Sequence, residues 1–221
     1  MEMKISPSMM CADFMELRQT LAAFEEAGIE YLHIDIMDGH FVPNFTLGTD
    51  FCKILKNNCS IPLDIHLMTE KPEEKLSWFD FGEGDIVSVH AESTAHLQKV
   101  LAAIKAQGAK AFAALNPATP VGVLENILDD IDGAVIMAVN PGFAGQKMIP
   151  ASLGKIKKLR EFLDAGGKTD AMIEVDGNVS FENAVKMKEA GADIFVAGTS
   201  SVFTKELALT DAITKMREIL R

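Results

Sequence analysis

Short apolar segments alternate with amphipathic ones along the whole chain. Eight of the short segments are rich in valine and isoleucine, and several are almost continuously apolar, as strands buried on both faces are. The strands predicted in this way are residues 4–10, 31–37, 62–68, 86–90, 109–115, 134–139, 172–175 and 194–197. A helical or partly helical segment follows each of them, so the pattern predicts alternating β and α elements from end to end.

Helical periodicity is visible between the strands. Residues 13–27 place apolar side chains three or four positions apart, and residues 93–107 and 180–190 follow the same pattern. The residues expected to cap the starts of these helices are Asp13, Ser93 and Ser180. Gly28 and Gly191 follow two of the helices, as left-handed C-caps often do.

Eight such units in 221 residues average about 28 residues each. This spacing favours a (β/α)8 barrel, the TIM barrel, over an open doubly wound sheet, although periodicity alone leaves the open sheet possible. No linker, low-complexity tract or block of charge divides the chain. We therefore predict one α/β barrel domain over residues 1–221.

Composition narrows the classes of partner. The net charge of −11 argues against a nucleic acid, because phosphate contacts need clustered lysine and arginine. The sequence has no apolar run of about 18 residues, so no membrane span is expected, and its first residues lack the apolar stretch of a signal peptide. Three cysteines without CxxC spacing argue against a disulfide framework. We expect a reduced, cytoplasmic protein.

The second predicted strand carries an unusual pair of polar residues. Because side chains alternate along a strand, His33, Asp35 and Met37 share one face, and Ile34 and Ile36 share the other. If the two isoleucines pack against helices, His33 and Asp35 point into the barrel. An unpaired charge is very costly there, and a bound metal ion would remove that cost.

Two other strands offer matching groups. Asp64, His66 and Met68 share a face of the third strand, and Asp176 stands at the end of the seventh, after Glu174. Two imidazoles and two carboxylates suit a divalent ion such as Zn, Mn, Fe or Co. Each residue alone has a structural alternative, a hydrogen-bonded core histidine or a loop cap. An HxD pair with a second histidine on the neighbouring strand favours the metal.

The loops after the last three strands are rich in glycine and hydroxyl groups. Glycine lets backbone N–H groups approach an anion closely, and barrels often bind phosphate at this position. Any one of these loops could be an ordinary turn, but three such loops at the same end of a barrel favour a phosphate-binding site. The candidate phosphate residues are Gly142, Phe143, Ala144, Gly145, Gly177, Asn178, Gly198, Thr199 and Ser200.

In combination, these segments resemble the ribulose-phosphate 3-epimerase family along essentially the whole chain. The matching stretches are residues 5–14, 33–44, 63–68, 139–146 and 173–177. The resemblance implies a TIM barrel of the ribulose-phosphate-binding type and epimerisation at C3 of a ketose phosphate, a small-molecule substrate. It also implies one divalent metal ion, Zn, Mn, Co, Fe or Mg, and a homo-oligomer.

The resemblance also assigns roles to individual residues. The implied metal ligands are His33, Asp35, His66 and Asp176. Asp35 and Asp176 are implied to be the acid and base as well, facing each other across the barrel axis, while Ser8 and His66 contact the substrate. Three methionines that composition alone would assign to core filling become a lining over the reacting centre, namely Met37, Met68 and Met137.

Three departures from the common family pattern concern the substrate. Met10-Cys11 replaces Leu-Ser, Ala144 replaces a glycine, and residues 198–203 are one residue longer. All three are similar to the D-allulose-6-phosphate 3-epimerase branch, whereas Asn140 and residues 12–13 look more like the pentulose branch.

We therefore expect interconversion of D-allulose 6-phosphate and D-fructose 6-phosphate. The alternatives are a D-ribulose 5-phosphate to D-xylulose 5-phosphate epimerase, a phosphate-binding lyase or decarboxylase, and a non-catalytic sugar-phosphate-binding barrel. A lyase or decarboxylase would usually have a catalytic lysine or glutamate at these strand ends, and a non-catalytic barrel would need no opposed carboxylates.

Overall fold

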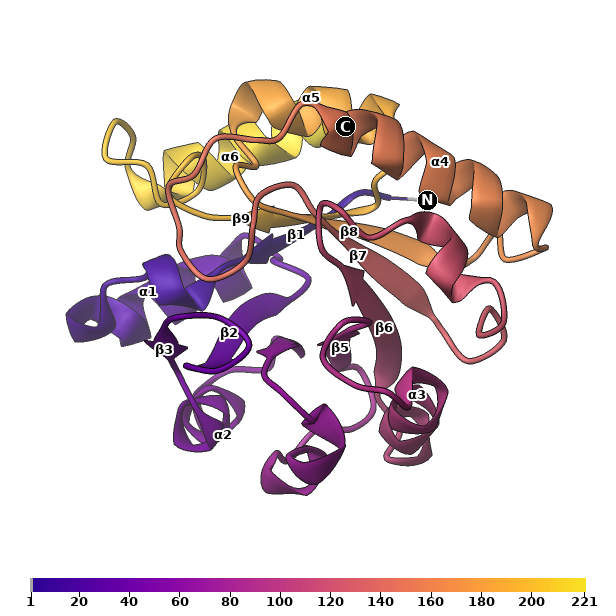
Figure 1. Cartoon of the computed structure of the whole chain (residues 1–221). Helices are drawn as coiled ribbons and strands as arrows, with labels where there is room; N and C mark the ends of the chain where they lie inside the picture. Colours follow the sequence, from indigo (N-terminus) through magenta and orange to yellow (C-terminus); the bar gives the residue numbers. More distant parts are fainter. Residues whose placement is uncertain (1) are drawn as a thin grey trace.

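The computed structural model describes residues 2–221, and its strands form one curled, mostly parallel sheet (Figure 1). The parallel strands are β1 (Lys4–Pro7), β2 (Leu32–Asp38), β4 (Leu63–Met68), β5 (Ile86–His90), β6 (Lys110–Leu115), β7 (Gly133–Met137), β8 (Met172–Asp176) and β9 (Ile194–Ala197). The sheet order is β1-β9-β8-β7-β6-β5-β4-β2-β3, where the short β3 (Phe45–Thr46) pairs antiparallel with β2. A parallel bridge between Ser8 and His33 joins β1 to β2 and closes the barrel.

Helices surround the barrel and cover the outer face of its strands (Figure 1). They are α1 (Leu17–Glu26), α2 (Thr49–Asn58), α3 (Leu97–Ala106), α4 (Ala151–Ala165), α5 (Phe181–Glu189) and α6 (Leu209–Leu220). Short 3-10 turns stand in place of a longer helix after β4 and β6, namely η3 (Pro72–Glu74), η4 (Leu76–Trp78) and η5 (Val121–Leu124). Between residues 2 and 221, no helix has the length and apolar character needed to cross a membrane.

The inside of the barrel is apolar at one end and polar at the other. A buried cluster that includes Phe112, Val135 and Ile194 fills the end where the strands begin. Gly133 leaves room for this packing, because a Cβ at that position would stand 2.4 Å from the Phe112 ring. Towards the carboxyl ends of the strands, buried histidines and carboxyl groups face inward beside several methionines. The polar groups at the carboxyl ends of the strands therefore lie on an apolar layer that fills the rest of the barrel.

All eight predicted strands are present, with ends displaced by a few residues. The first is shorter than predicted, because the 3-10 turn η1 (Met9–Cys11) follows soon after Pro7. The Ser180 hydroxyl caps α5 as expected. The prediction for Ser93 was wrong, since its hydroxyl donates to the His90 carbonyl and α3 begins further along the chain.

Candidate active site

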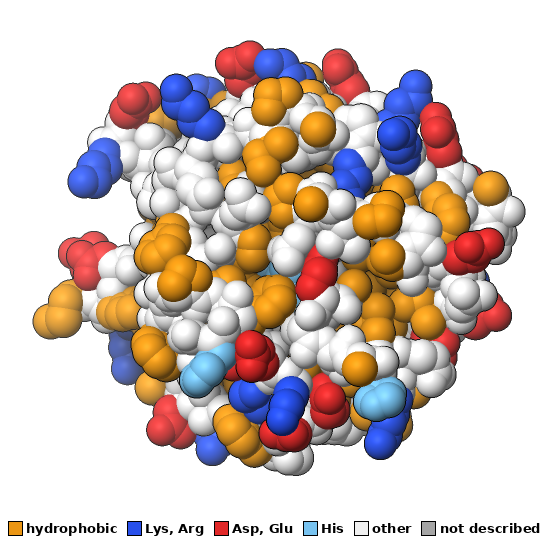
Figure 2. Space-filling view, in the orientation of Figure 1, with side chains coloured by type: hydrophobic (Ala, Val, Ile, Leu, Met, Phe, Trp, Pro, Cys, Tyr) orange, Lys and Arg blue, Asp and Glu red, His pale blue; other side chains and the backbone are white. Residues whose placement is uncertain are grey.

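A pocket opens at the carboxyl ends of the strands, and Figure 2 shows it as a hollow with hydrophobic side chains around it. Asp35 and Asp176 line it, together with most of the residues predicted to contact substrate. Those residues are Ser8, Met37, Met68, Met137, Gly142, Phe143, Ala144, Gly145, Gly177, Asn178, Gly198, Thr199 and Ser200. Met37 and Met68 pack with Val42 in one apolar cluster on the wall. The pocket therefore combines a carboxylate pair with an apolar wall.

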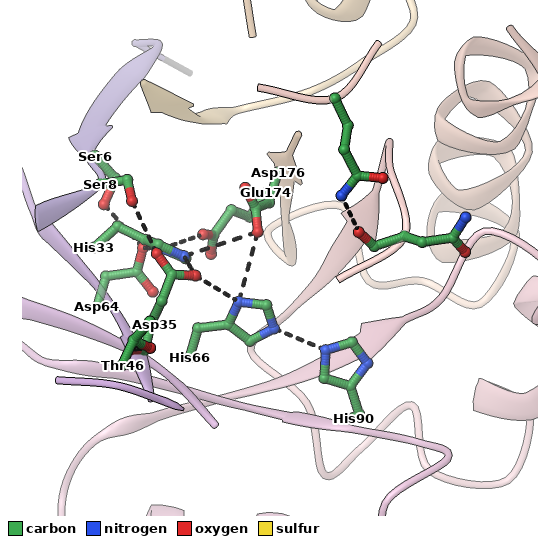
Figure 3. A network of polar contacts seen from close by, with 12 residues as sticks. Ser6, Ser8, His33, Asp35, Thr46, Asp64, His66, His90, Glu174 and Asp176 are labelled. Atoms are coloured by element: carbon green, nitrogen blue, oxygen red, sulfur yellow. Dashed lines mark hydrogen bonds and ion pairs between the residues drawn. The ribbon is translucent and has the colours of Figure 1, made fainter. Parts of the chain in front are cut away.

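Four predicted metal ligands converge beside this pocket (Figure 3). His33 and Asp35 come from β2, His66 from the adjacent β4, and Asp176 from the end of β8. His33 Nε2 lies 3.4 Å from Asp35 Oδ1 and 3.9 Å from Asp176 Oδ2. His66 Nδ1 lies 3.7 Å and 3.6 Å from the same two oxygens. One atom from each residue thus faces a common point.

The geometry of this cluster fits a divalent cation. His33 Nε2 and His66 Nδ1 are buried, and neither has a hydrogen-bond partner within residues 2–221. Four ligands placed about 2.0–2.2 Å from a zinc-like ion lie roughly 3.3–3.6 Å from one another. The nitrogen–oxygen distances of the cluster, 3.4 to 3.9 Å, are close to that range. Two imidazole rings and two carboxyl groups also provide the nitrogen and oxygen donors that such ions take.

A second layer of polar groups lies beneath the cluster and orients His33. His33 Nδ1 lies 2.6 Å from Asp64 Oδ2 and 3.2 Å from Glu174 Oε1, and the Ser6 hydroxyl donates to Asp64 at 2.8 Å. These contacts turn Nε2 of His33 towards the pocket. Sequence reasoning placed Asp64 on the face of His66 and Glu174 just before Asp176, but it did not assign either of them a supporting role. The available signal was their spacing, since each stands two residues before a proposed ligand on the same face of its strand.

His66 has its own supporting contact, which sequence reasoning missed. Its Nε2 lies 2.9 Å from Nε2 of the fully buried His90, at the end of β5. Burial lowers the pKa of His90 to about 4, which keeps this imidazole neutral. The only signal in the sequence was a histidine at the tip of a neighbouring strand.

The two carboxyl groups differ in their acidity. Burial raises the pKa of Asp35, but the imidazoles of His33 and His66 outweigh it and hold the pKa below its ordinary value. Burial raises the pKa of Asp176, and the nearby Asp35 carboxylate adds to that rise. The Ser8 hydroxyl donates to Asp35 Oδ2 at 2.8 Å. The pKa values of the two carboxyl groups are thus shifted in opposite directions, and Asp35 is the stronger acid of the pair.

The loops after β7, β8 and β9 meet at one side of the pocket. Asn178 links them: its Oδ1 accepts from the Met148 amide at 3.1 Å, and its Nδ2 donates to the Ser200 hydroxyl at 3.1 Å. Gly177 has a φ of +110°, and a Cβ there would stand 2.6 Å from a Val139 methyl group. The predicted phosphate loops are therefore brought together, with backbone groups and hydroxyls close to one another.

The arrangement of the chain resembles solved α/β enzymes. One is a mutant tryptophan synthase α-subunit from Pyrococcus furiosus, with a TM-score of 0.65 over 100% of this chain and 99% of that one at 15% identity. Another is a 3-hexulose-6-phosphate synthase, with a TM-score of 0.60 over 100% of both chains at 13% identity. At these identities the likeness shows the fold alone, and it confirms the predicted TIM barrel.

Comparison of the sequence with known proteins identifies a family as well as a fold. The model of the ribulose-phosphate 3-epimerase family matches residues 4–203. The ribulose-phosphate 3-epimerase of Bacillus subtilis is 46% identical over 89% of this chain and 91% of its own length. The chloroplastic enzyme of Arabidopsis thaliana is 44% identical over 92% and 73%, and the Escherichia coli enzyme 39% over 89% and 87%. The chain therefore belongs to the ribulose-phosphate 3-epimerase family, whose members are isomerases that act on a ketose phosphate.

Proposed function

We propose that this protein is a metal-dependent 3-epimerase that interconverts D-ribulose 5-phosphate and D-xylulose 5-phosphate. The observation that carries the proposal is the cluster of His33, Asp35, His66 and Asp176. In it, two carboxyl groups whose pKa values are shifted in opposite directions lie beside two buried imidazole nitrogens that have no hydrogen-bond partner among the described residues. The relatives aligned over about nine-tenths of the chain carry the name of this activity. The sequence favoured D-allulose 6-phosphate instead, and that substrate receives no support from the relatives.

The positions that suggested the six-carbon substrate have a simple packing explanation. Cys11 Sγ lies beside Gly198, 3.4 Å from where a Cβ of that residue would stand, so two of the altered segments contact each other. Residues 198–203 form a tight turn, in which the amides of Ser201 and Phe203 donate to the Gly198 carbonyl, both at 3.1 Å. The turn absorbs the additional residue and buries Val202. This packing supports the interpretation that the three departures are a local change in loop packing and do not lengthen the substrate pocket.

The proposed reaction removes the C3 proton beside a carbonyl and returns it to the opposite face. Inversion needs two acid/base groups, and Asp35 and Asp176 reach the site from different strands, β2 and β8. Asp35, whose pKa is lowered, is suited to accept a proton as a carboxylate, and Asp176, whose pKa is raised, is the better suited of the two to donate one. In the reverse direction their roles exchange.

Other residues of the site hold the substrate and exclude water. A divalent cation held by the four ligands would supply positive charge that stabilises the negative charge developing on the substrate during proton removal. Met37, Met68 and Met137 cover the reacting centre with apolar surface. No lysine or arginine is among the described residues that line the pocket, so backbone N–H groups and the hydroxyls of Thr199 and Ser200 bind the phosphate. The expected homo-oligomer, the cytoplasmic location and the identity of the metal stay predictions.

The substrate proposal is tested by kcat/KM for both sugar phosphates on one metal-loaded preparation. We expect D-ribulose 5-phosphate to be preferred by about 10- to 200-fold, the discrimination that one carbon unit usually permits. The variant Cys11→Ser is a matched control, and we expect it to change the ratio by less than about threefold, because serine keeps nearly the shape of Cys11, which lines the pocket and packs against Gly198. A tenfold preference for D-allulose 6-phosphate would place the chain in the hexulose branch and leave the metal ligands and the acid/base pair unchanged.

A further inference from the structure

A row of side chains leads from the proposed metal site into the barrel wall. His66 Nε2 lies 2.9 Å from His90 Nε2 (Figure 3), and His90 Nδ1 lies 3.3 Å from Glu92 Oε2. The two imidazole rings are fully buried and meet end to end, with centroids 5.0 Å apart and 23° between their planes. Each ring nitrogen in this row, apart from the one that faces the metal site, therefore has one defined partner.

This geometry permits only one placement of the hydrogens when His66 ligates a metal. A neutral imidazole that ligates through Nδ1 carries its hydrogen on Nε2. That hydrogen meets His90 Nε2, which must be the unprotonated, accepting nitrogen. His90 then carries its hydrogen on Nδ1 and donates it to Glu92, whose ionised carboxylate only accepts. With His90 in the other tautomer, two N–H groups would face each other between buried rings.

The position of Glu92 is fixed by several contacts, so its carboxylate can determine which nitrogen of His90 carries the hydrogen. Its other oxygen accepts from the Asn116 amide at 2.9 Å and from the Thr119 hydroxyl. Burial raises the pKa of Glu92, but its hydrogen bonds with His90, Thr119 and Asn116 outweigh it and lower the pKa to about 2. The Lys155 ammonium donates to the Asn116 carbonyl, which connects the loop after β6, where Asn116 and Thr119 stand, to α4. Glu92 thus stays an acceptor in a fixed position.

We propose that His90 and Glu92 are positioning residues that fix the tautomer and the ring orientation of His66, and that they thereby strengthen metal binding at the active site. The inference rests on the metal site proposed above. Partners that hydrogen-bond the second nitrogen of a ligating histidine typically change metal affinity by about 10- to 100-fold when removed. Neither residue is among those that line the pocket, and the row of contacts connects them to the site through His66.

The first test is the zinc dissociation constant of Glu92→Gln, measured by competition with a chelating indicator. Glutamine keeps the shape of Glu92 and can still accept from Asn116 and Thr119, but its amide N–H faces His90 Nδ1. We expect zinc to bind about 10- to 100-fold more weakly. Thr119→Val is the matched control, because it removes a contact of the opposite carboxylate oxygen, and we expect a change below about threefold.

A pair of substitutions at His90 separates the hydrogen bond from simple packing. The amide oxygen of His90→Gln can stand near the position of Nε2 and accept from His66, whereas His90→Leu offers no acceptor. We expect His90→Leu to bind zinc about 10- to 100-fold more weakly, and His90→Gln to recover most of that loss. Equal losses in both variants would show that His90 only fills space.

Histidine nitrogen NMR reads the tautomers directly, since the chain has only five histidines. In zinc-loaded wild type we expect His66 to be protonated at Nε2 and His90 at Nδ1, and we expect His90 to lose that form in Glu92→Gln. Zinc affinities of Glu92→Gln and His90→Leu within about threefold of wild type would overturn the inference while the metal site stands. Wild-type protein that binds no zinc, manganese or cobalt would overturn the metal site itself, and this inference with it.

Discussion

Replacing Asp176 by asparagine is expected to lower kcat by at least about a thousandfold while the protein stays folded. The amide has nearly the same shape as the carboxyl group but can neither accept nor return the C3 proton. It is also a poorer ligand for a cation than a carboxylate. Asp176 stands at the end of β8, where its side chain is 16% exposed, so the substitution leaves no cavity in the core.

The matched control is Asp132→Asn, just before β7 at the opposite end of the barrel, where the carboxylate binds the Lys105 ammonium and the Ala111 amide. We expect this variant to keep its turnover. Thermal unfolding and metal content are measured for both variants, so that loss of the fold or of the cation is distinguished from loss of the acid/base group. Full activity in Asp176→Asn would contradict the two-base mechanism.

Removal of the divalent cation is the change with the next largest expected effect. Dialysis against a strong chelator is expected to lower turnover by more than about a hundredfold, because no lysine or arginine of the pocket lining takes over the charge near the substrate oxygens. Adding back about one equivalent of Mn²⁺, Co²⁺ or Zn²⁺ should restore the rate. The measurement pairs turnover with metal analysis of the same samples. An unchanged rate at less than about a tenth of an equivalent of metal would contradict the role of the cation.

The fold was predictable because its strands have a simple signature. Strands covered on one face by helices and facing the barrel interior on the other are apolar along most of their length, and glycines end several of the intervening helices. Closure of the barrel was not predictable from periodicity, since it depends on how β1 meets β2, where a bridge joins Ser8 to His33. The short β3 was missed, because two residues are too few for a pattern.

The metal cluster was largely predictable and its supporting residues were not. His33 and Asp35 stand two positions apart on one strand, which places them on one face. His66 and Asp176 were further candidates from their strand positions, and the family resemblance assigned all four as ligands. The role of His90 depends on the register between β4 and β5, which pairs His66 with Ser88 and places His90 two residues further along the same face of β5. Register between parallel strands cannot be read from one sequence. The contact between Cys11 and Gly198, far apart in the sequence, could not be read from one sequence either, and the substrate prediction did not include it.

The central claim is that this chain inverts C3 of a pentulose phosphate by proton exchange. It is tested most directly by incubating metal-loaded protein with D-ribulose 5-phosphate in deuterium oxide and following the sugar by proton NMR. The account predicts that D-xylulose 5-phosphate accumulates and that the C3 proton signal is lost as deuterium from the solvent replaces it. Ribulose 5-phosphate that keeps both its configuration and its C3 proton, in the presence of protein shown to hold its metal, would contradict the account.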